Sequence, residues 1–263
     1  DRMNIIKSII ISLMLIIMTG CSQHEILITA HRGASGVAPE NTMSAYLLAM
    51  EMNAEYAELD VQETADDVLV LFHDKNYIRT AGDSSNVWDM PYDSIVGFDV
   101  GSWKSEAYAG EPIPLFADII DSVNGRMKLN VEIKMNGHQD GLTEHVLEVL
   151  QEKNFADQCI ITSFNLDAVD KIRALDPSFT VGYIFSKMPK DRDVFVADVD
   201  LLSVKNKLVT KEFVEKAHAA GKKVHVWGKV DEPEEMERLY KLKIDSPITN
   251  HPDRWRTFLS EKK

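Results

Sequence analysis

Two histidines in the first third of the chain each follow a short apolar run. His31 comes directly after the run at 26–30, and His73 directly after the run at 68–72. An imidazole titrates near neutral pH, so one histidine can take a proton from a nucleophile while the other gives one to a leaving group. A single histidine at such a position would more often be structural. The pair therefore predicts a general acid–base couple if both strands end at the same place.

Three carboxylates stand in comparable positions. Glu58 and Asp60 are two residues apart in the apolar run at 56–61, so on a strand they point to the same face, and Glu132 closes another run. Neighbouring carboxylates repel one another unless a cation lies between them. An all-oxygen ligand set favours Ca²⁺ or Mg²⁺ over Zn²⁺, so we predict one such ion at these three residues. In the alternative, each acid pairs with a nearby base, Arg32 or Lys134.

Those two bases complete the set. Arg32 follows His31 and offers a planar fork to phosphate oxygens, and Lys134, on the same face as Glu132, adds a second positive charge. A metal, two cations, an acid and a base are what the hydrolysis of a phosphodiester requires. The cluster at 39–42 has a predicted structural role, organising a loop and capping the helix that begins near Thr42.

An alternation of strands and helices is expected to position these side chains. Strand-like runs occur near 26–30, 56–61, 68–72, 128–133, 159–163, 179–184, 201–204, 223–227 and 246–249. Helical periodicity occupies 42–53, 141–153, 166–175, 210–220 and 234–242. Such alternation predicts a parallel sheet with crossover helices.

The runs at 56–61 and 68–72 are separated by a tight turn that includes Asp67, so we expect a hairpin and count it as one unit. Eight units then remain, which predicts an α/β fold of the TIM type, a (β/α)8 barrel. A doubly wound open sheet is the alternative. It would usually show a Gly-x-Gly-x-x-Gly turn, and the segment from His31 to Gly36 lacks the first of those glycines.

The segment at 75–112 has many glycines and aromatic residues but little periodicity. We expect it to be a small insertion after the second barrel strand, or in the blander alternative a satellite subdomain packed by its own aromatic side chains.

The N-terminal residues predict export and lipidation. A basic start and an apolar run precede Met18-Thr19-Gly20-Cys21, which resembles the lipobox of bacterial lipoproteins. We therefore expect a signal peptide at 1–20, a lipidated Cys21 with a linker to residue 25, the barrel at 26–263, and a protein anchored at the cell envelope. An ordinary secretory signal or a transmembrane anchor is the alternative.

The net charge of −13 at pH 7 argues against binding to nucleic acid or to anionic lipid through a basic patch. Beyond Cys21 the sequence has only Cys159, in an apolar run, which excludes a disulfide framework and a thiolate metal site in the barrel.

Together the motifs resemble those of the glycerophosphodiester phosphodiesterase family. They are His31-Arg32-Gly33, Ala38-Pro39-Glu40-Asn41-Thr42, Glu58-Leu59-Asp60-Val61, Phe72-His73-Asp74, Val131-Glu132-Ile133-Lys134, Val224-His225-Val226-Trp227 and Ile248-Thr249-Asn250-His251-Pro252-Asp253. The resemblance covers essentially the whole of 26–263, in order, and the combination is highly specific.

The resemblance implies a (β/α)8 barrel that hydrolyses glycerophosphodiesters to sn-glycerol 3-phosphate and an alcohol. It implies His31 and His73 as the acid–base pair, Glu58, Asp60 and Glu132 as ligands of Ca²⁺ or Mg²⁺, and Arg32 and Lys134 as phosphate ligands. Trp227 would line the glycerol side, whereas we expect His225 to be packed inside the barrel.

Two alternatives remain open at this stage. One is a barrel phospholipase of the C or D type that acts on intact lipids, and the other is a non-catalytic surface lipoprotein. Folds of this kind carry many functions, so the assignment depends on the site.

Overall fold

Eight parallel strands close into a barrel in the computed structural model, which describes residues 24–262. The strand order is β1-β9-β8-β7-β6-β5-β4-β2, and β1 also pairs with β2, which closes the ring. The strands are β1 (Thr29–Ala30), β2 (Tyr56–Glu63), β3 (Leu69–Leu71), β4 (Lys128–Ile133), β5 (Cys159–Ser163), β6 (Thr180–Phe185), β7 (Leu201–Lys205), β8 (Lys223–Trp227) and β9 (Ser246–Thr249). The predicted (β/α)8 barrel is confirmed, and the open sheet is excluded.

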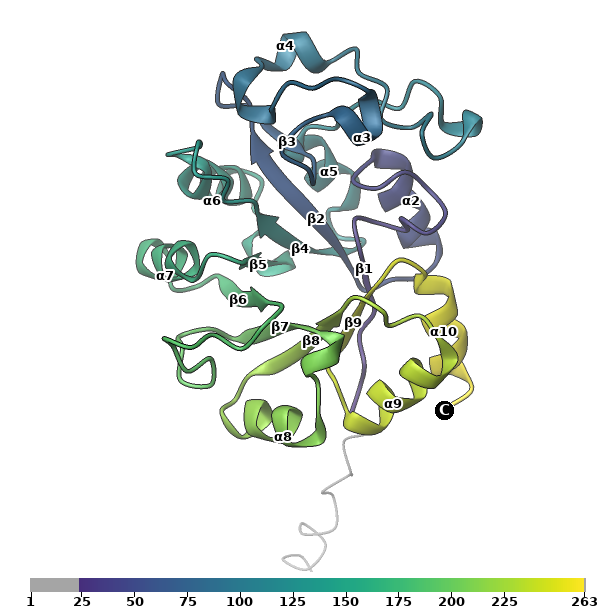
Figure 1. Ribbon diagram of the computed structural model, residues 1–263, viewed down its shortest axis with the longest axis vertical. Coiled ribbons are helices and arrows are strands. Elements are labelled where there is room, and N and C mark those ends of the chain that lie inside the picture. The colour runs from purple at the N-terminus through teal and green to yellow at the C-terminus, as the bar shows by residue number, and fades with distance from the viewer. Residues whose placement is uncertain (1–23, 263) are drawn as a thin grey trace, which may run out of the picture.

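Helices surround the barrel, as Figure 1 shows. They are α2 (Met43–Glu51), α5 (Phe116–Val123), α6 (Leu142–Glu152), α7 (Leu166–Leu175), α8 (Lys211–Ala219), α9 (Pro233–Leu242) and α10 (Pro252–Ser260). Caps mark several of their starts, because Thr42, Asn165 and Thr210 accept backbone N–H groups of α2, α7 and α8. No helix in residues 24–262 is long and apolar enough to cross a membrane.

The strand β3 runs antiparallel to β2, which confirms the predicted hairpin. Asp67 in its turn has φ 63, a left-handed conformation that aspartate tolerates. The first strand is shorter than expected, since only Thr29 and Ala30 pair, although Ile26 and Ile28 are buried in the core.

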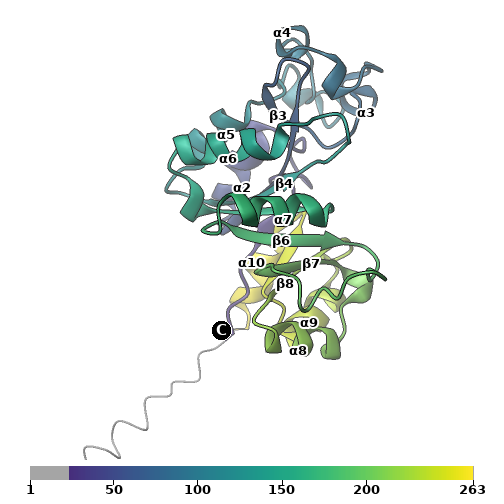
Figure 2. The same cartoon turned by 90° about the vertical axis from the view of Figure 1, so that its left-hand side faces the viewer.

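The segment at 75–112 forms a separate small layer, at the top of Figures 1 and 2. It contains α3 (Ile78–Ala81), α4 (Tyr92–Ile95), and the 3-10 turns η1 (Val87–Asp89) and η2 (Glu106–Tyr108). A second apolar cluster, distinct from the barrel core, holds it together, with Phe72, Tyr77 and Phe98 in contact. The predicted insertion is therefore also a satellite with an aromatic core of its own.

The insertion is attached to the loop after β1 and to the first turn of α2. Lys104 Nζ donates to the carbonyls of Ser35 and Gly36 at 2.7 and 3.1 Å, and the Glu111 carboxylate accepts from the backbone and side chain of Ser44. These contacts place the insertion beside the C-terminal ends of β1 and β2, where the candidate site lies.

Candidate active site

The predicted site residues within 24–262 meet at the C-terminal edge of the barrel. His31 and Arg32 follow β1, Glu58 and Asp60 lie on β2, and His73 follows the hairpin strand β3. Glu132 lies on β4, Lys134 follows it, and Trp227 ends β8. All but Asp60 line one cavity of about 100 Å³, and Asp60 adjoins it through the other carboxylates. Cys21 lies outside the described residues.

The three carboxylates form a compact buried cluster. Asp60 and Glu132 are directly paired across β2 and β4, and one oxygen from each of Glu58, Asp60 and Glu132 lies within 4.8 Å of the others. Burial, together with the charges of Asp60 and Glu132, raises the pKa of Glu58 well above its usual value. Burial and the charge of Asp60 likewise raise the pKa of Glu132 to about 7. The cluster therefore holds more negative charge than its surroundings neutralise.

Two bases neutralise part of this charge. Lys134 Nζ lies 2.7 Å from Glu132 Oε1 and 3.3 Å from Asp60 Oδ1, and Arg32 Nε lies 3.1 Å from Asp60 Oδ2. Burial alone would raise the pKa of Asp60, but Lys134 and Arg32 hold it below its usual value. The alternative of acid–base pairing thus accounts for Asp60 and Glu132. Glu58 accepts only the backbone N–H of Arg32 among the described residues, at 2.8 Å.

The donor set fits a divalent cation. Asp60 Oδ1 is buried and accepts no hydrogen bond from the described residues, and the third carboxylate, Glu58, has no cationic side chain within hydrogen-bond distance. A hard cation beside Glu58, Asp60 and Glu132 would satisfy these oxygens and relieve their repulsion. These three residues could therefore hold a metal ion.

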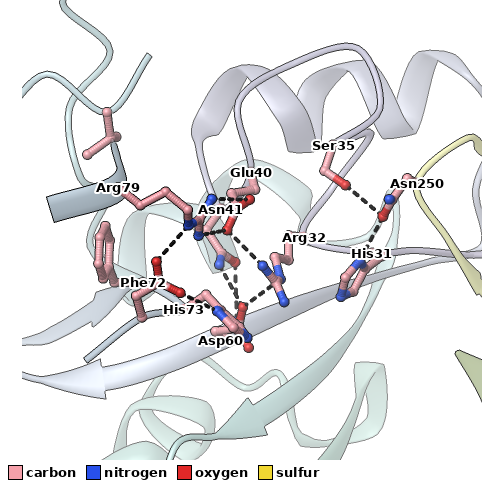
Figure 3. A network of polar contacts seen from close by, with 12 residues as sticks. His31, Arg32, Ser35, Glu40, Asn41, Asp60, Phe72, His73, Arg79 and Asn250 are labelled. Carbon is pink, nitrogen blue, oxygen red and sulfur yellow. Dashed lines mark hydrogen bonds and ion pairs between the residues drawn. The ribbon is translucent and has the colours of Figure 1, made fainter. Parts of the chain in front are cut away.

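His31 is held at the rim by the loop after β9. Its Nδ1 lies 2.7 Å from Asn250 Oδ1, which also accepts the Ser35 hydroxyl, as Figure 3 shows. An amide oxygen only accepts, so this bond puts the proton on Nδ1 and leaves Nε2 facing Glu58 Oε2 at 4.0 Å. Burial and the charge of Arg32 lower the pKa of His31 to about 4.

His73 is held by a carboxylate. Its Nδ1 lies 2.7 Å from Asp74 Oδ1, and Arg79 Nε donates to the other oxygen of Asp74 at 2.7 Å. The Nε2 atom of His73 thus remains available on the cavity side. Burial lowers the pKa of His73, and the charge of Asp60 opposes this shift.

The motif at 39–42 organises the loop and also contacts the site residues directly. Thr42 caps α2 as predicted, and Asn41 Nδ2 donates to Asp60 Oδ2 at 2.8 Å. Glu40 accepts from Arg32 at 2.8 Å and from Arg79 at 2.7 and 3.0 Å (Figure 3). The Glu40 carboxylate thus orients both the predicted phosphate ligand Arg32 and Arg79, which holds Asp74.

The backbone turn after β1 aims Arg32 inward. Arg32 and Gly33 both have positive φ, 54 and 77, and a Cβ at Gly33 would lie 2.6 Å from the backbone of Ala45. Only glycine fits there without displacing α2. Asn41 also has a positive φ of 56, so the site carries backbone strain at two non-glycine positions.

Gln62 was not predicted, although its spacing carries the information. It lies two residues beyond Asp60 on β2 and is fully buried. Its amide donates to the carbonyls of Phe72 and Asp74, on either side of His73, at 2.6 and 2.7 Å. Its oxygen accepts from Asn136, in the loop after Lys134, at 2.6 Å. Gln62 therefore connects the segment of His73 to that of Lys134.

Trp227 borders the catalytic cavity from the end of β8. Its ring packs edge-on against Phe164 with centroids 5.8 Å apart, and its Nε1 donates to Ser203 O at 3.3 Å. His225, two residues earlier, is buried in the barrel as predicted, and burial lowers its pKa to about 4. Cys159 is also buried, in agreement with its expected place in the core.

Comparisons with known proteins give a consistent result. The sequence model of the glycerophosphoryl diester phosphodiesterase family matches residues 31–254. A glycerophosphodiester phosphodiesterase of Caldanaerobacter subterraneus is 32% identical over 231 residues, covering 86% of this chain and 95% of that protein. One from Bacillus subtilis is 29% identical over 252 residues, covering 88% of this chain and 86% of that protein.

A solved structure agrees. A phosphodiesterase from Oleispira antarctica, in complex with the product sn-glycerol-3-phosphate, superposes with a TM-score of 0.83 at 28% identity. The match covers 89% of this chain and 96% of that one.

Proposed function

Because the chain belongs to the glycerophosphoryl diester phosphodiesterase family, we propose that His31 and His73 carry out its general acid–base chemistry. The protein is a glycerophosphodiester phosphodiesterase, and it hydrolyses glycerophosphodiesters to sn-glycerol 3-phosphate and an alcohol. The observation that carries the proposal is the convergence of two histidines and two cations on three buried carboxylates at one edge of the barrel.

The reaction needs one proton removed and one delivered. Water attacks phosphorus, the bond from phosphorus to the alcohol oxygen breaks, and the leaving alkoxide takes a proton. His31 is neutral near pH 7 and carries its proton on Nδ1, so its free Nε2 takes a proton from the attacking water. The carboxylate of Asp74 stabilises a protonated His73, which donates to the leaving oxygen.

Arg32 and Lys134 bind the phosphate in this scheme. Both are more than four-fifths buried and fixed by carboxylates, so their charges are presented to the phosphate oxygens without reorganisation. Glu58, Asp60 and Glu132 would hold one divalent cation, Ca²⁺ or Mg²⁺. When bound, that ion supplies positive charge to the nonbridging oxygens.

Turnover of soluble glycerophosphodiesters by residues 22–263, with and without chelator, tests this function. We expect alcohol and sn-glycerol 3-phosphate as products, loss of activity in EDTA, and recovery with Ca²⁺ or Mg²⁺. Either ion should also raise the melting temperature of the wild type and not of Glu58→Gln. Full activity in excess EDTA would argue against the metal, and a failure to form sn-glycerol 3-phosphate would argue against the function.

The place of action is a separate part of the proposal. The pattern at Met18–Cys21 supports a lipid on Cys21 that anchors the enzyme at the cell envelope. Incorporation of labelled fatty acid into the full chain, and its loss in Cys21→Ser, is the expected result. Labelled Cys21→Ser protein would contradict it.

A further inference from the structure

A second cavity opens beside the catalytic one. Its volume is about 580 Å³, and it lies over the C-terminal ends of β4, β5 and β6. The two cavities share Glu132, Lys134 and Phe164 in their linings. A group attached to the phosphate can therefore pass from the catalytic cavity into this second one, which we call the side groove.

We propose that the side groove binds the alcohol portion of the substrate and favours an alcohol that carries an ammonium group. This inference rests on the proposed function, because it assumes that the phosphate lies between Arg32 and Lys134.

The apolar side of the groove suits a cation. Phe164 is 48% exposed and Met135 37% exposed, which are large values for such side chains, and Tyr183 is half-buried. Aromatic faces attract ammonium groups, and a polarisable thioether packs well against methyl groups. Trp227 contacts Phe164 from the catalytic side, so the aromatic wall continues from one cavity into the other.

The charges of the groove also favour a cation. Arg192 donates to Asp170 and Asp167 at 2.7 and 2.6 Å, so two carboxylates offset its charge. Lys134 is likewise occupied by Asp60 and Glu132. Asp191, by contrast, forms no ion pair with the described residues.

Asp191 lies close to the aromatic wall. Burial raises the pKa of the Tyr183 hydroxyl, and the charge of Asp191 adds to that shift. The two lysines of the same loop, Lys187 and Lys190, are not part of the lining. A carboxylate beside aromatic faces, with the nearby bases engaged elsewhere, is a suitable site for an ammonium group.

The test compares matched substrates and matched inhibitors. Glycerophosphocholine carries an ammonium head group and glycerophosphoglycerol a neutral one, and the wild type should prefer the first by about tenfold in kcat/KM. Choline should inhibit more strongly than 3,3-dimethylbutan-1-ol, its neutral isostere. Asp191→Asn and Phe164→Leu should each lower the preference by about threefold to tenfold.

Asp93→Asn is the control, since it makes the same change at an exposed position of α4 outside the groove. It should leave both ratios as in the wild type. Equal kcat/KM for the two substrates, or an unchanged preference in Asp191→Asn, would overturn the assignment of the groove. Those results would leave the proposed function intact. If neither diester is cleaved, the proposed function itself is wrong.

Discussion

The two halves of the barrel differ in what they bring to the site. The half from β1 to β4 contributes all of the predicted catalytic, phosphate and metal residues, whereas the half from β5 to β9 contributes Trp227. In the first half, carboxylates, bases and amides form one connected network of short contacts (Figure 3). In the second half, aromatic side chains and the side groove border the same cavity.

This difference separates two demands on the enzyme. Chemistry needs groups that are fixed in position, and the network of the first half supplies this. Recognition of varied alcohols needs an open surface that changes without disturbing the reacting atoms. Damage to the first half should therefore lower turnover, and damage to the second should alter affinity, selectivity or stability.

The largest effect is expected at the histidines. His31→Ala and His73→Ala should each lower kcat by about 10²–10⁴-fold, because each loses a proton transfer in the transition state. Steady-state kinetics on glycerophosphocholine, with circular dichroism to confirm folding, measures this. A substrate with a nitrophenolate leaving group should restore turnover to the acid variant, His73→Ala, and not to the base variant, His31→Ala. Near wild-type rates in either variant would remove that residue from the mechanism.

The second half of the barrel should lose stability in acid, because it contains the buried His225. Burial lowers the pKa of His225 from 6.5 in the unfolded chain to about 4 in the folded protein, so the unfolded chain binds the additional proton between these values. The free energy of unfolding should fall as the pH drops from about 6.5 to about 4, and this residue accounts for roughly 3 kcal/mol of the fall. Urea titrations across this range should show a flatter pH dependence in His225→Gln. The same slope in both proteins would refute the prediction.

A smaller loss is expected at Gln62, the connecting residue of the first half. Gln62→Leu removes both donors from the carbonyls that flank His73, and displacement of His73 should lower kcat by about 10–100-fold with little change in KM. Gln151→Leu is the matched control, because that amide donates to Asp176 on the outer surface. A rise in KM alone would show that Gln62 acts on binding and not on the position of His73.

The smallest effect belongs to Trp227. Trp227→Phe keeps an aromatic ring but loses area and the hydrogen bond to Ser203, so KM should rise by about threefold to tenfold while kcat stays nearly constant. A fall in kcat comparable to that of the histidine variants would contradict the division between the two halves.

The sequence predicted the side chains that follow the strands and not the contacts that hold them. His31, Asp60 and Glu132 were identified because the ends of parallel barrel strands meet at one edge. Asn250, which holds His31, is separated from it by 219 residues, and no local pattern indicates such a contact.

Two local patterns in the sequence also carry structural information. Gln62 continues the two-residue spacing of Glu58 and Asp60, and the helix α5 has buried residues at Phe116, Ile119, Ile120 and Val123 in the expected periodicity. The start of α5 is difficult to recognise in the sequence, because the irregular sequence of the insertion continues directly into the helix. The side groove could not be predicted, since its residues come from loops whose paths depend on the closed barrel.

Closure of that barrel has a consequence for the order of folding. Thr29 and Ala30 pair with Ile248 and Thr249, so the ring closes only after nearly the whole chain has been synthesised. Asn250 follows directly and fixes His31. Contacts so distant in sequence form late, because a long loop must lose its entropy first. Helices and most strand pairs can thus assemble while the enzyme is still inactive, and the return of activity after denaturant removal reports the joining of the first strand to the last.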